Sequence, residues 1–233
     1  MEEKILKIAI LMLTHNAPKY VYECITTLEK TKLNNNLDYD LIVLDNKSNF
    51  FTKYILKYLK NKGKINYLHF NDHNAFFAKG NNMACKFASD DITHYLLLNS
   101  DIRINSGEWL ERLVSIHPKE GGISSFGAVL GEPIRADGYC MLIDRFLYDK
   151  YQLDEEYEWW WSVTKLQSQI IKDNYLINAV VNHEKYIHHY GGKSGKSWKD
   201  AKGMKVDINF VKSWFMDKKD NIRIIEDIDL KQN

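Results

Sequence analysis

The sequence predicts a single α/β domain of the doubly wound type, with a sheet flanked by helices. Short, almost wholly apolar runs at residues 7–14, 40–46 and 94–102 each end in polar residues, as strands covered on both faces do. Segments with apolar residues at helical spacing lie between these runs. The chain of 233 residues is long enough to bury a full core, and it contains no recognisable linker or repeat.

Each expected element rests on a local pattern. Pro18 stands near the start of a helix, where proline is tolerated, and Gly63 ends the next helix. The first half should contain strands at residues 7–14, 40–46, 65–70 and 94–102 and helices near residues 18–28, 51–63 and 81–90. In such an alternating arrangement, ligands bind at the carboxyl ends of the strands.

Beyond residue 105 the pattern changes. We expect a helix at residues 107–117, a glycine-rich extended segment at 121–131, a strand running into a helix at 138–150, a helix within 153–174 and a strand within 175–190. The whole chain, residues 1–233, should form one domain. We expect it to divide into a first half (1–104), a second half (105–200) that supplies a different surface, and a C-terminal helix and tail (201–233).

Composition argues against several classes of function. The 32 lysines and arginines nearly balance the 31 aspartates and glutamates, and the net charge of +1 argues against nucleic acid as a partner. The three cysteines are far apart in apolar stretches, which favours reduced core thiols. The N-terminus does not resemble a signal peptide, and no apolar run reaches the roughly 18 residues of a transmembrane segment. We expect a cytoplasmic protein, or one peripheral at a membrane.

Polar residues follow three of the expected strands, at Thr14 to Asn16, at Asp45 and Asn46, and at Asn99-Ser100-Asp101. In a parallel sheet these positions gather along one edge and could line one cleft. Because Asn, Asp and Ser are also common in turns and helix caps, each group taken alone is equally compatible with a structural role.

The segment "HHYGGKSGKSW" at residues 188–198 contains Gly-Lys-Ser, as phosphate-binding Walker loops do. Such a loop needs a glycine five positions before Gly195, where this chain has Tyr190. The following "WKDAKGMK" does not read as the helix that should come next. The segment is therefore not a Walker loop.

The stretch "NAFFAKGNNMACKFASDDITHYLLLNSDI" resembles the segment "N-x-G-F-A-x-G-x-N-x-G…A…LLLN-P-D" of family 2 glycosyltransferases of the GT-A fold, notably their rhamnosyltransferase-like branch. "LTHNAPKYVYECITTL", "VLDNKS", "GYCMLIDR", "LDEEYE" and "HHYGGKS" are similar to further motifs of that family, in the same order. The resemblance covers roughly residues 7 to 195. It implies a single GT-A domain with a Rossmann-like mixed sheet flanked by helices. Residues 1–104 would then be the nucleotide-binding half and residues 105–200 the acceptor and catalytic half.

The resemblance also implies a site for a nucleotide-sugar. Thr14 and Asp45 would hold the uracil or ribose, with Asn16 and Asn46 beside them. Lys79, Gly80 and Asn82 would border the same base and ribose. The donor would be a nucleotide-diphosphate sugar, most simply linked to UDP or dTDP.

Asn99-Ser100-Asp101 matches the family's "D-x-D" position, where the last aspartate binds Mn²⁺ or Mg²⁺ bridging the diphosphate. Hard divalent cations prefer carboxylate and phosphate oxygens. By spacing from Ser194, His189 matches the family's histidine and would be a second metal ligand. Lys193, with Lys196 and Lys199, would neutralise the diphosphate as a glycine-rich lid closes. The alternative is a solvated basic loop with a surface histidine.

The expected catalytic base is missing. Inverting members carry "E-D-x-D" after "F-D-E-x-F", with an acidic residue that deprotonates the acceptor hydroxyl. The aligned positions here are Ser162, Val163, Thr164 and Lys165. Glu158, Asp137 and Glu155 are the alternatives, beside a mechanism without an enzymic base and a chain that binds donor but transfers poorly.

Trp159, Trp160 and Trp161 follow these carboxylates directly. Indole faces stack on sugar rings and on apolar surfaces, so the three residues either form an acceptor platform or partly fill the core.

These features together predict a metal-dependent glycosyltransferase acting in glycan biosynthesis, which moves a sugar from a nucleotide-diphosphate donor to a hydroxyl of a glycan or glycoconjugate. The alternative is a nucleotide-sugar-binding protein that kept the fold and lost the catalytic base.

Overall fold

The computed structural model describes residues 5–194, 197–215 and 219–226. Its strands are β1 (Leu6–Thr14), β2 (Leu37–Asp45), β3 (Tyr67–Phe70), β4 (His94–Leu98), β5 (Ile102–Ile104), β6 (Gly122–Phe126), β7 (Ala128–Val129), β8 (Arg135–Ala136), β9 (Cys140–Asp144), β10 (Leu176–Val180), β11 (Ile187–His189) and β12 (Ile222–Ile225). Its α-helices are α1 (Pro18–Leu28), α2 (Phe50–Asn61), α3 (Phe76–Ala84), α4 (Trp109–Ser115), α5 (Arg145–Tyr151), α6 (Trp160–Lys172) and α7 (Ile208–Ser213). Short 3₁₀ turns are η1 (Cys85–Phe87), η2 (Ser197–Asp200) and η3 (Lys219–Asn221).

The centre is an eight-stranded mixed sheet in the order β12-β10-β6-β9-β4-β1-β2-β3. In it, β9 runs antiparallel to its neighbours β4 and β6, and the other paired strands are parallel. Two small antiparallel pairs, β5 with β11 and β7 with β8, lie outside this sheet. The predicted mixed sheet flanked by helices is confirmed.

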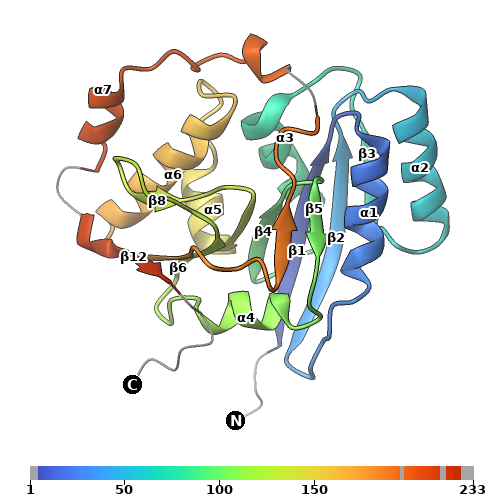
Figure 1. Cartoon of the computed structure of the whole chain (residues 1–233), viewed down its shortest axis with the longest axis horizontal. Helices are drawn as coiled ribbons and strands as arrows, with labels where there is room; N and C mark the ends of the chain where they lie inside the picture. Colours follow the sequence, from blue (N-terminus) through green and yellow to red (C-terminus); the bar gives the residue numbers. More distant parts are fainter. Residues whose placement is uncertain (1–4, 195–196, 216–218, 227–233) are drawn as a thin grey trace.

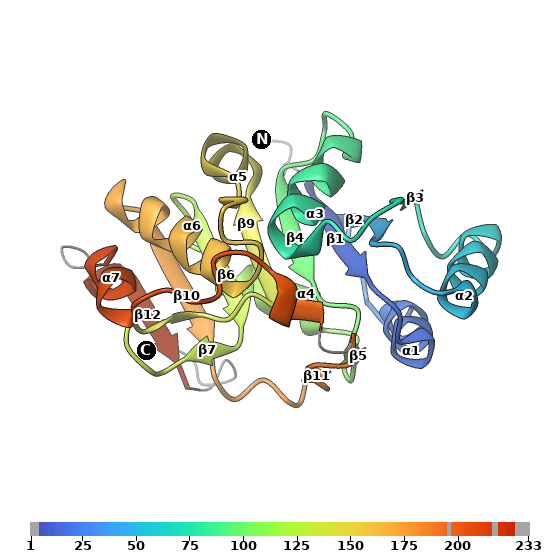
Figure 2. The ribbon, with the colours of Figure 1, turned by 90° about the horizontal axis from the view of Figure 1, so that it is seen from above.

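Helices cover both faces of the sheet (Figures 1 and 2). Buried residues of α1, α2 and α4 pack with Ile8, Ile10 and Met12 of β1 in one apolar core. Buried residues of α3, α5, α6 and α7 pack with Ala9 and Leu11 of the same strand in the other. Alternate side chains of β1 thus enter opposite cores, which explains why this strand reads as an unbroken apolar run.

Three boundaries differ from the sequence-based expectation. Helix α3 begins at Phe76 rather than near residue 81, because the amides of Phe77 and Ala78 donate to the carbonyl of Glu158, a partner that helical spacing cannot reveal. The expected strand at 94–102 is two strands, β4 and β5, interrupted by Asn99-Ser100-Asp101. The segment 175–190 likewise holds two strands, β10 and β11.

The C-terminal region contains more than the expected helix and tail. After α7, residues 222–225 form β12, which pairs in parallel with β10 and closes one edge of the sheet. Its pattern "IRII" is only four residues long, too short to stand out from a tail by periodicity.

The three cysteines are buried and free, as expected of core thiols. Burial raises the pKa of Cys24 to about 12 and that of Cys85 to about 11, so both stay protonated at neutral pH. Within the described ranges, the helices are too short or too polar to cross a bilayer.

Candidate active site at the carboxyl edge of the sheet

A cavity of about 360 Å³ lies where β1, β2 and β4 end. Thr14, Asn46 and Asn99-Ser100-Asp101, which follow three separate strands, all line it. The remaining lining comes from the start of α3, the loop around β8, the start of α6 and the chain after β11: Leu13, His15, Ala17, Asn74, Phe76, Phe77, Val129, Arg135, Ala136, Asp137, Gly138, Tyr139, Trp159, Trp160, Val163, Thr164, His189, Gly192 and Ser194. The predicted gathering of polar strand ends in one cleft is therefore observed.

Beneath this cavity, Asp45 orients Thr14. The Thr14 hydroxyl donates to Asp45 Oδ1 at 2.8 Å, and the Ser48 amide donates to Asp45 Oδ2 at 3.0 Å. Asp45 is fully buried, and it does not line the cavity. Its carboxylate is thus held by the chain itself, while Thr14 and the adjoining His15 present the polar surface.

Two asparagines hold together the loops next to Thr14 and Asp45. Asn46 donates to the Phe76 carbonyl at 3.1 Å and accepts from Asn71 at 3.0 Å, so it ties the end of β2 to the loop before α3. Asn16 has a positive φ of 59° and accepts from the Asn49 amide at 2.9 Å, which joins the two loops after β1 and β2. Asn46 lines the cavity and Asn16 does not.

Strand pairing brings Asp101 and His189 together. β5 and β11 are antiparallel, with His189 opposite Ile102, and the Tyr190 amide donates to the Asp101 carbonyl at 3.0 Å. His189 Nε2 consequently lies 3.3 Å from Asp101 Oδ1. His188, on the alternate face of the strand, instead contacts Glu184 at 2.9 Å.

The Asp101 carboxylate is mostly buried and ionised. Burial raises its pKa, but His189 and the Lys193 amide, which donates to Oδ2 at 3.3 Å, outweigh that effect and hold the pKa below its ordinary value. Tyr139 stacks on the His189 ring at a centroid distance of 4.1 Å. His189 Nε2 is buried and makes no hydrogen bond of good geometry to the described residues. An ionised carboxylate and an unsatisfied imidazole nitrogen therefore face the same point.

Comparison with known proteins bears directly on this site. The family model "Glycosyl transferase family 2" matches residues 9–177. The chain belongs to this family. No curated protein gives a significant match to the chain.

Solved structures share the fold of this chain at low identity. The crystal structure of S. aureus TarS 1-349 superposes with a TM-score of 0.62 at 15% identity, covering 91% of this chain and 71% of that one. TarS 1-349 in complex with UDP gives 0.54 at 18%, covering 70% and 55%. Mannosyltransferase PcManGT from Pyrobaculum calidifontis, in complex with GDP-Man and Mn²⁺, gives 0.56 at 14%, covering 70% and 52%. The match thus spans only about half the length of two of these chains.

These comparisons confirm the predicted family and the GT-A fold. The narrower assignment to a rhamnosyltransferase-like branch stays a prediction.

Two of the residues predicted to touch the nucleotide, Gly80 and Asn82, also serve the packing of α3. A Cβ on Gly80 would lie 2.8 Å from a Leu13 methyl, so glycine lets α3 approach β1 closely. Asn82 is buried and bonds to Leu153, Tyr148 and Glu155. Lys79 and Lys193 are exposed, and neither lines the cavity.

The three alternatives for the base lie in different places. The Glu158 carboxylate accepts from the Lys202 amide at 2.7 Å and does not line the cavity. Glu155 is exposed, and its carboxylate accepts from Asn82 at 3.1 Å. Asp137 lines the cavity, with Oδ1 accepting from the Gly138 amide at 2.7 Å. Of the three, Asp137 alone faces the cavity.

The loop that carries Asp137 packs against the position where the family's acidic motif would stand. A Cβ on Gly138 would lie 3.0 Å from Val163 Cγ2, and Val163 and Thr164 line the cavity beside it. Ser162 is buried and donates to the Trp159 carbonyl at 2.6 Å. The absent carboxylates thus leave an apolar and hydroxyl surface next to Asp137.

The three tryptophans divide between cavity and core. Trp159 and Trp160 line the cavity, and Trp160 is 43% exposed. Trp161 packs against the core beneath α6, and its indole N–H donates to the Met204 carbonyl at 3.4 Å.

Sequence reasoning missed two cavity residues. Among the described lysines and arginines, Arg135 alone lines the cavity. Its guanidinium lies 5.6 Å from the Trp161 ring centre. Tyr139, which orients His189, donates or accepts a hydrogen bond with His183 at 2.7 Å. Tyr139 stands inside the "GYCML" motif, but no motif marks Arg135.

Proposed function

We propose that this chain transfers a sugar from a nucleotide-diphosphate donor, UDP- or dTDP-linked, to a hydroxyl of a glycan or glycoconjugate. The observation that carries the proposal is the Asp101–His189 pair at the carboxyl edge of a family 2 glycosyltransferase fold. That TarS was solved with UDP and the archaeal mannosyltransferase with GDP-Man and Mn²⁺ supports a nucleotide-sugar as the ligand class. A cytoplasmic or membrane-peripheral location belongs to the same proposal.

The residues present fit a divalent cation. Asp101 offers an ionised carboxylate oxygen and His189 a buried nitrogen without a hydrogen bond, 3.3 Å apart. Carboxylate and imidazole suit Mn²⁺, and Mg²⁺ would rely more on Asp101 and the diphosphate. When bound, the cation would supply positive charge that stabilises the departing diphosphate.

The remaining steps fall to side chains of the cavity. Thr14 and His15 would contact the nucleotide, and Trp160 would stack on the acceptor sugar. Asp137 Oδ2 would take the proton of the acceptor hydroxyl as its oxygen bonds to the anomeric carbon and the bond from that carbon to the diphosphate breaks. Arg135 would offset negative charge beside Asp137. Burial lowers the pKa of Arg135 and the Asp137 charge opposes that effect.

Donor hydrolysis and calorimetric binding with UDP-, dTDP- and GDP-sugars, each with and without Mn²⁺, test this function. Asp101→Ala should abolish the Mn²⁺-dependent part of nucleotide binding. Equal affinity of the variant would discard the metal assignment.

Asp137→Asn should lower transfer by about 10²–10⁴-fold, because the amide cannot accept the proton, and should leave donor affinity unchanged. Glu158→Gln and Glu155→Gln are the matched controls and should keep most of the activity. A loss confined to Glu158→Gln would move the base to Glu158.

A second function is favoured by Val163 and Thr164, which occupy the place of the family's acidic motif. The chain would then bind a nucleotide-sugar without transferring it. Tight binding of a donor with no turnover towards any acceptor or water would support this alternative.

A further inference from the structure

Three side chains converge at the opposite end of the sheet from the cavity. His94 begins β4, Asp144 ends the antiparallel β9 directly opposite it, and His117 follows α4. One nitrogen of each histidine and a carboxylate oxygen all lie within 4.8 Å of one another. Asn99 follows β4 and lies five positions after His94, a distance of about 16 Å, so this cluster is separate from the Asp101 site.

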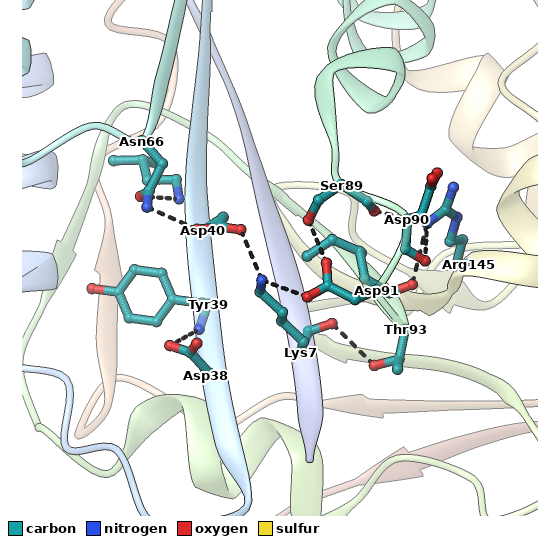
Figure 3. Close-up of polar contacts among 12 residues, drawn as sticks. Lys7, Asp38, Tyr39, Asp40, Asn66, Ser89, Asp90, Asp91, Thr93 and Arg145 are labelled. Atoms are coloured by element: carbon teal, nitrogen blue, oxygen red, sulfur yellow. Dashed lines mark hydrogen bonds and ion pairs between the residues drawn. The ribbon is translucent and has the colours of Figure 1, made fainter. Parts of the chain in front are cut away.

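The hydrogen bonds around His94 decide which of its nitrogens carries a proton. The Thr93 hydroxyl lies 3.0 Å from the Lys7 carbonyl and must donate to it, since a carbonyl can only accept (Figure 3). That hydroxyl has no second proton, so its 2.9 Å contact with His94 Nδ1 requires Nδ1–H to be the donor. In a neutral His94, Nε2 therefore carries no proton and presents a lone pair.

This lone pair points at negative charge. His94 Nε2 lies 3.3 Å from Asp144 Oδ1, and Asp144 Oδ2 already accepts from the Gly122 amide at 2.7 Å. The contact between His94 and Asp144 is favourable only when a proton on Nε2 or a metal cation lies between the nitrogen and the carboxylate oxygen.

We propose that His94, His117 and Asp144 bind one Zn²⁺-like divalent cation, with water as the fourth ligand. Two imidazoles and a carboxylate are a common tetrahedral zinc donor set. At zinc–ligand distances of about 2.0–2.1 Å, neighbouring ligands of a tetrahedron lie about 3.3 Å apart, which the His94–Asp144 contact matches.

The second layer of contacts orients all three ligands. His117 Nδ1 lies 3.0 Å from the Ser124 hydroxyl, as His94 Nδ1 lies near Thr93, and metal-bound histidines usually donate their other N–H in this way. His117 Nε2 lies 2.8 Å from Asp144 Oδ2, a direct hydrogen bond that coordination of the cation would replace. The cation would join β4, β9 and the connection between α4 and β6.

Metal analysis on tag-free protein tests this site. Asp101→Ala/His189→Ala serves as the background, so that the first site cannot contribute and no activity is measured. This protein should bind one Zn²⁺ per chain, show the visible absorption of tetrahedral Co²⁺, and gain about 5–10 °C in Tm with saturating Zn²⁺.

In the same background, His94→Gln and His117→Gln should each weaken Zn²⁺ binding at least tenfold and remove the Co²⁺ spectrum. His188→Gln, at a half-buried histidine outside the cluster, should change neither. If one of the first two variants fails to fold, the other decides. No Zn²⁺ binding by the background protein, or equal binding by the folded His94→Gln variant, would overturn the proposal and leave a protonated His94–Asp144 pair instead.

A second and independent feature is the outer face of α2, at the margin of the molecule (Figures 1 and 2). Phe50, Phe51 and Tyr54 are 75%, 70% and 64% exposed. Phe50 stacks on Tyr54 at 6.5 Å, so the rings form one patch. Large exposed aromatic patches on a single helix mark interaction surfaces.

The charge around this patch has one sign. Residues 46 to 71 include six lysines and no aspartate or glutamate, in a chain whose net charge is only +1. Lys53 and Lys57 flank the aromatic stripe at helical spacing, while Lys64, farther along, pairs with Glu29. Lysines beside exposed aromatic rings complement an anionic lipid surface better than a neutral protein surface.

We infer that the α2 face, comprising Phe50, Phe51, Tyr54, Lys53 and Lys57, binds anionic lipid bilayers. Because α2 follows the carboxyl end of β2, Phe50 and Phe51 lie at the edge of the sheet that carries the cavity. Binding through them would bring that edge towards the bilayer.

Sedimentation with phosphatidylcholine vesicles, with and without phosphatidylserine, tests this surface without any activity measurement. Binding should require phosphatidylserine and fall with added salt. Phe50→Ser/Phe51→Ser and, separately, Lys53→Glu/Lys57→Glu should each reduce it by about tenfold, and Phe210→Ser, an exposed aromatic on α7, should not. Absence of binding to anionic vesicles, or an equal loss with Phe210→Ser, would overturn the inference.

Discussion

At the scale of single residues, a polar side chain near a ligand site can stabilise the fold through its hydrogen bonds rather than contact the ligand. Asn82 matches a family motif and was expected beside the ribose. Its amide instead spans α3 and the loop after α5 through bonds to the Leu153 backbone, the Tyr148 hydroxyl and the Glu155 carboxylate. We therefore expect Asn82 to act through the fold rather than through a contact with the donor.

Asn82→Ala should reduce stability by about 3 kcal/mol, because several buried groups lose their partners at once. In a chain of this size that corresponds to a fall in Tm of about 6–12 °C. Donor affinity, measured by calorimetry below the lowered Tm, should stay within about twofold. Lys79→Ala, on the exposed side of the same helix, is the control and should change neither. A large loss of donor affinity at unchanged Tm would restore Asn82 to the nucleotide site.

The same scale shows what the sequence could and could not reveal. The place of Asp101 and His189 at one cavity was predictable, because both stand in motifs whose order matches a family. Their role as metal ligands stays a prediction. Arg135 was not, because its position in the cavity depends on the short β7–β8 pair, which has no periodic signal. The contact between Gly138 and Val163, which places Asp137 beside the missing acidic motif, is likewise visible only in three dimensions.

At the scale of elements, the segment after β11 is held over the cavity by a few backbone contacts. The Tyr190 amide anchors one end on Asp101, and Glu158 and Lys202 exchange two hydrogen bonds near the other end. Gly191 and Gly192 both have a φ of 65°, a conformation that glycine adopts without strain. The glycines of "HHYGGKS" thus shape a turn, and the lid function predicted for this segment stays a prediction. Lys196 lies outside the described residues.

Glu158→Ala should loosen this segment, because the Lys202 amide loses the side-chain acceptor that holds it. Limited proteolysis should cut the variant several-fold faster within residues 190–207, and the KM for donor should rise while kcat changes less. Glu158→Gln keeps an acceptor oxygen and should resemble the unaltered protein in both measurements. Equal proteolysis of all three proteins would show that Glu158 does not anchor the segment.

At the scale of the whole molecule, the apolar runs predicted the central strands well because burial on both faces leaves little room for polar residues. The strand β9 and the helix after it were predicted from the sequence. The antiparallel direction of β9, the edge strand β12 and the β5–β11 pair were beyond sequence reasoning, since pairing direction and partner depend on contacts between distant residues. The β5–β11 pair is decisive for the candidate site, because it places His189 opposite Ile102 and therefore beside Asp101.

Binding of the donor should therefore stabilise the whole domain, since the cavity joins both halves of the chain. With UDP at about 100 times its Kd in the presence of Mn²⁺, the free energy of unfolding should rise by about 2.7 kcal/mol and Tm by about 5–10 °C. Without Mn²⁺, UDP should raise the Tm by less. In His189→Ala the rise in Tm with UDP should be the same with and without Mn²⁺. Differential scanning fluorimetry measures all three, with Mn²⁺ alone as the control for the ion's own effect. If UDP raised the Tm of His189→Ala as much as that of the unaltered protein, with the same dependence on Mn²⁺, His189 would not be a metal ligand. Asp101 would then be the remaining protein ligand.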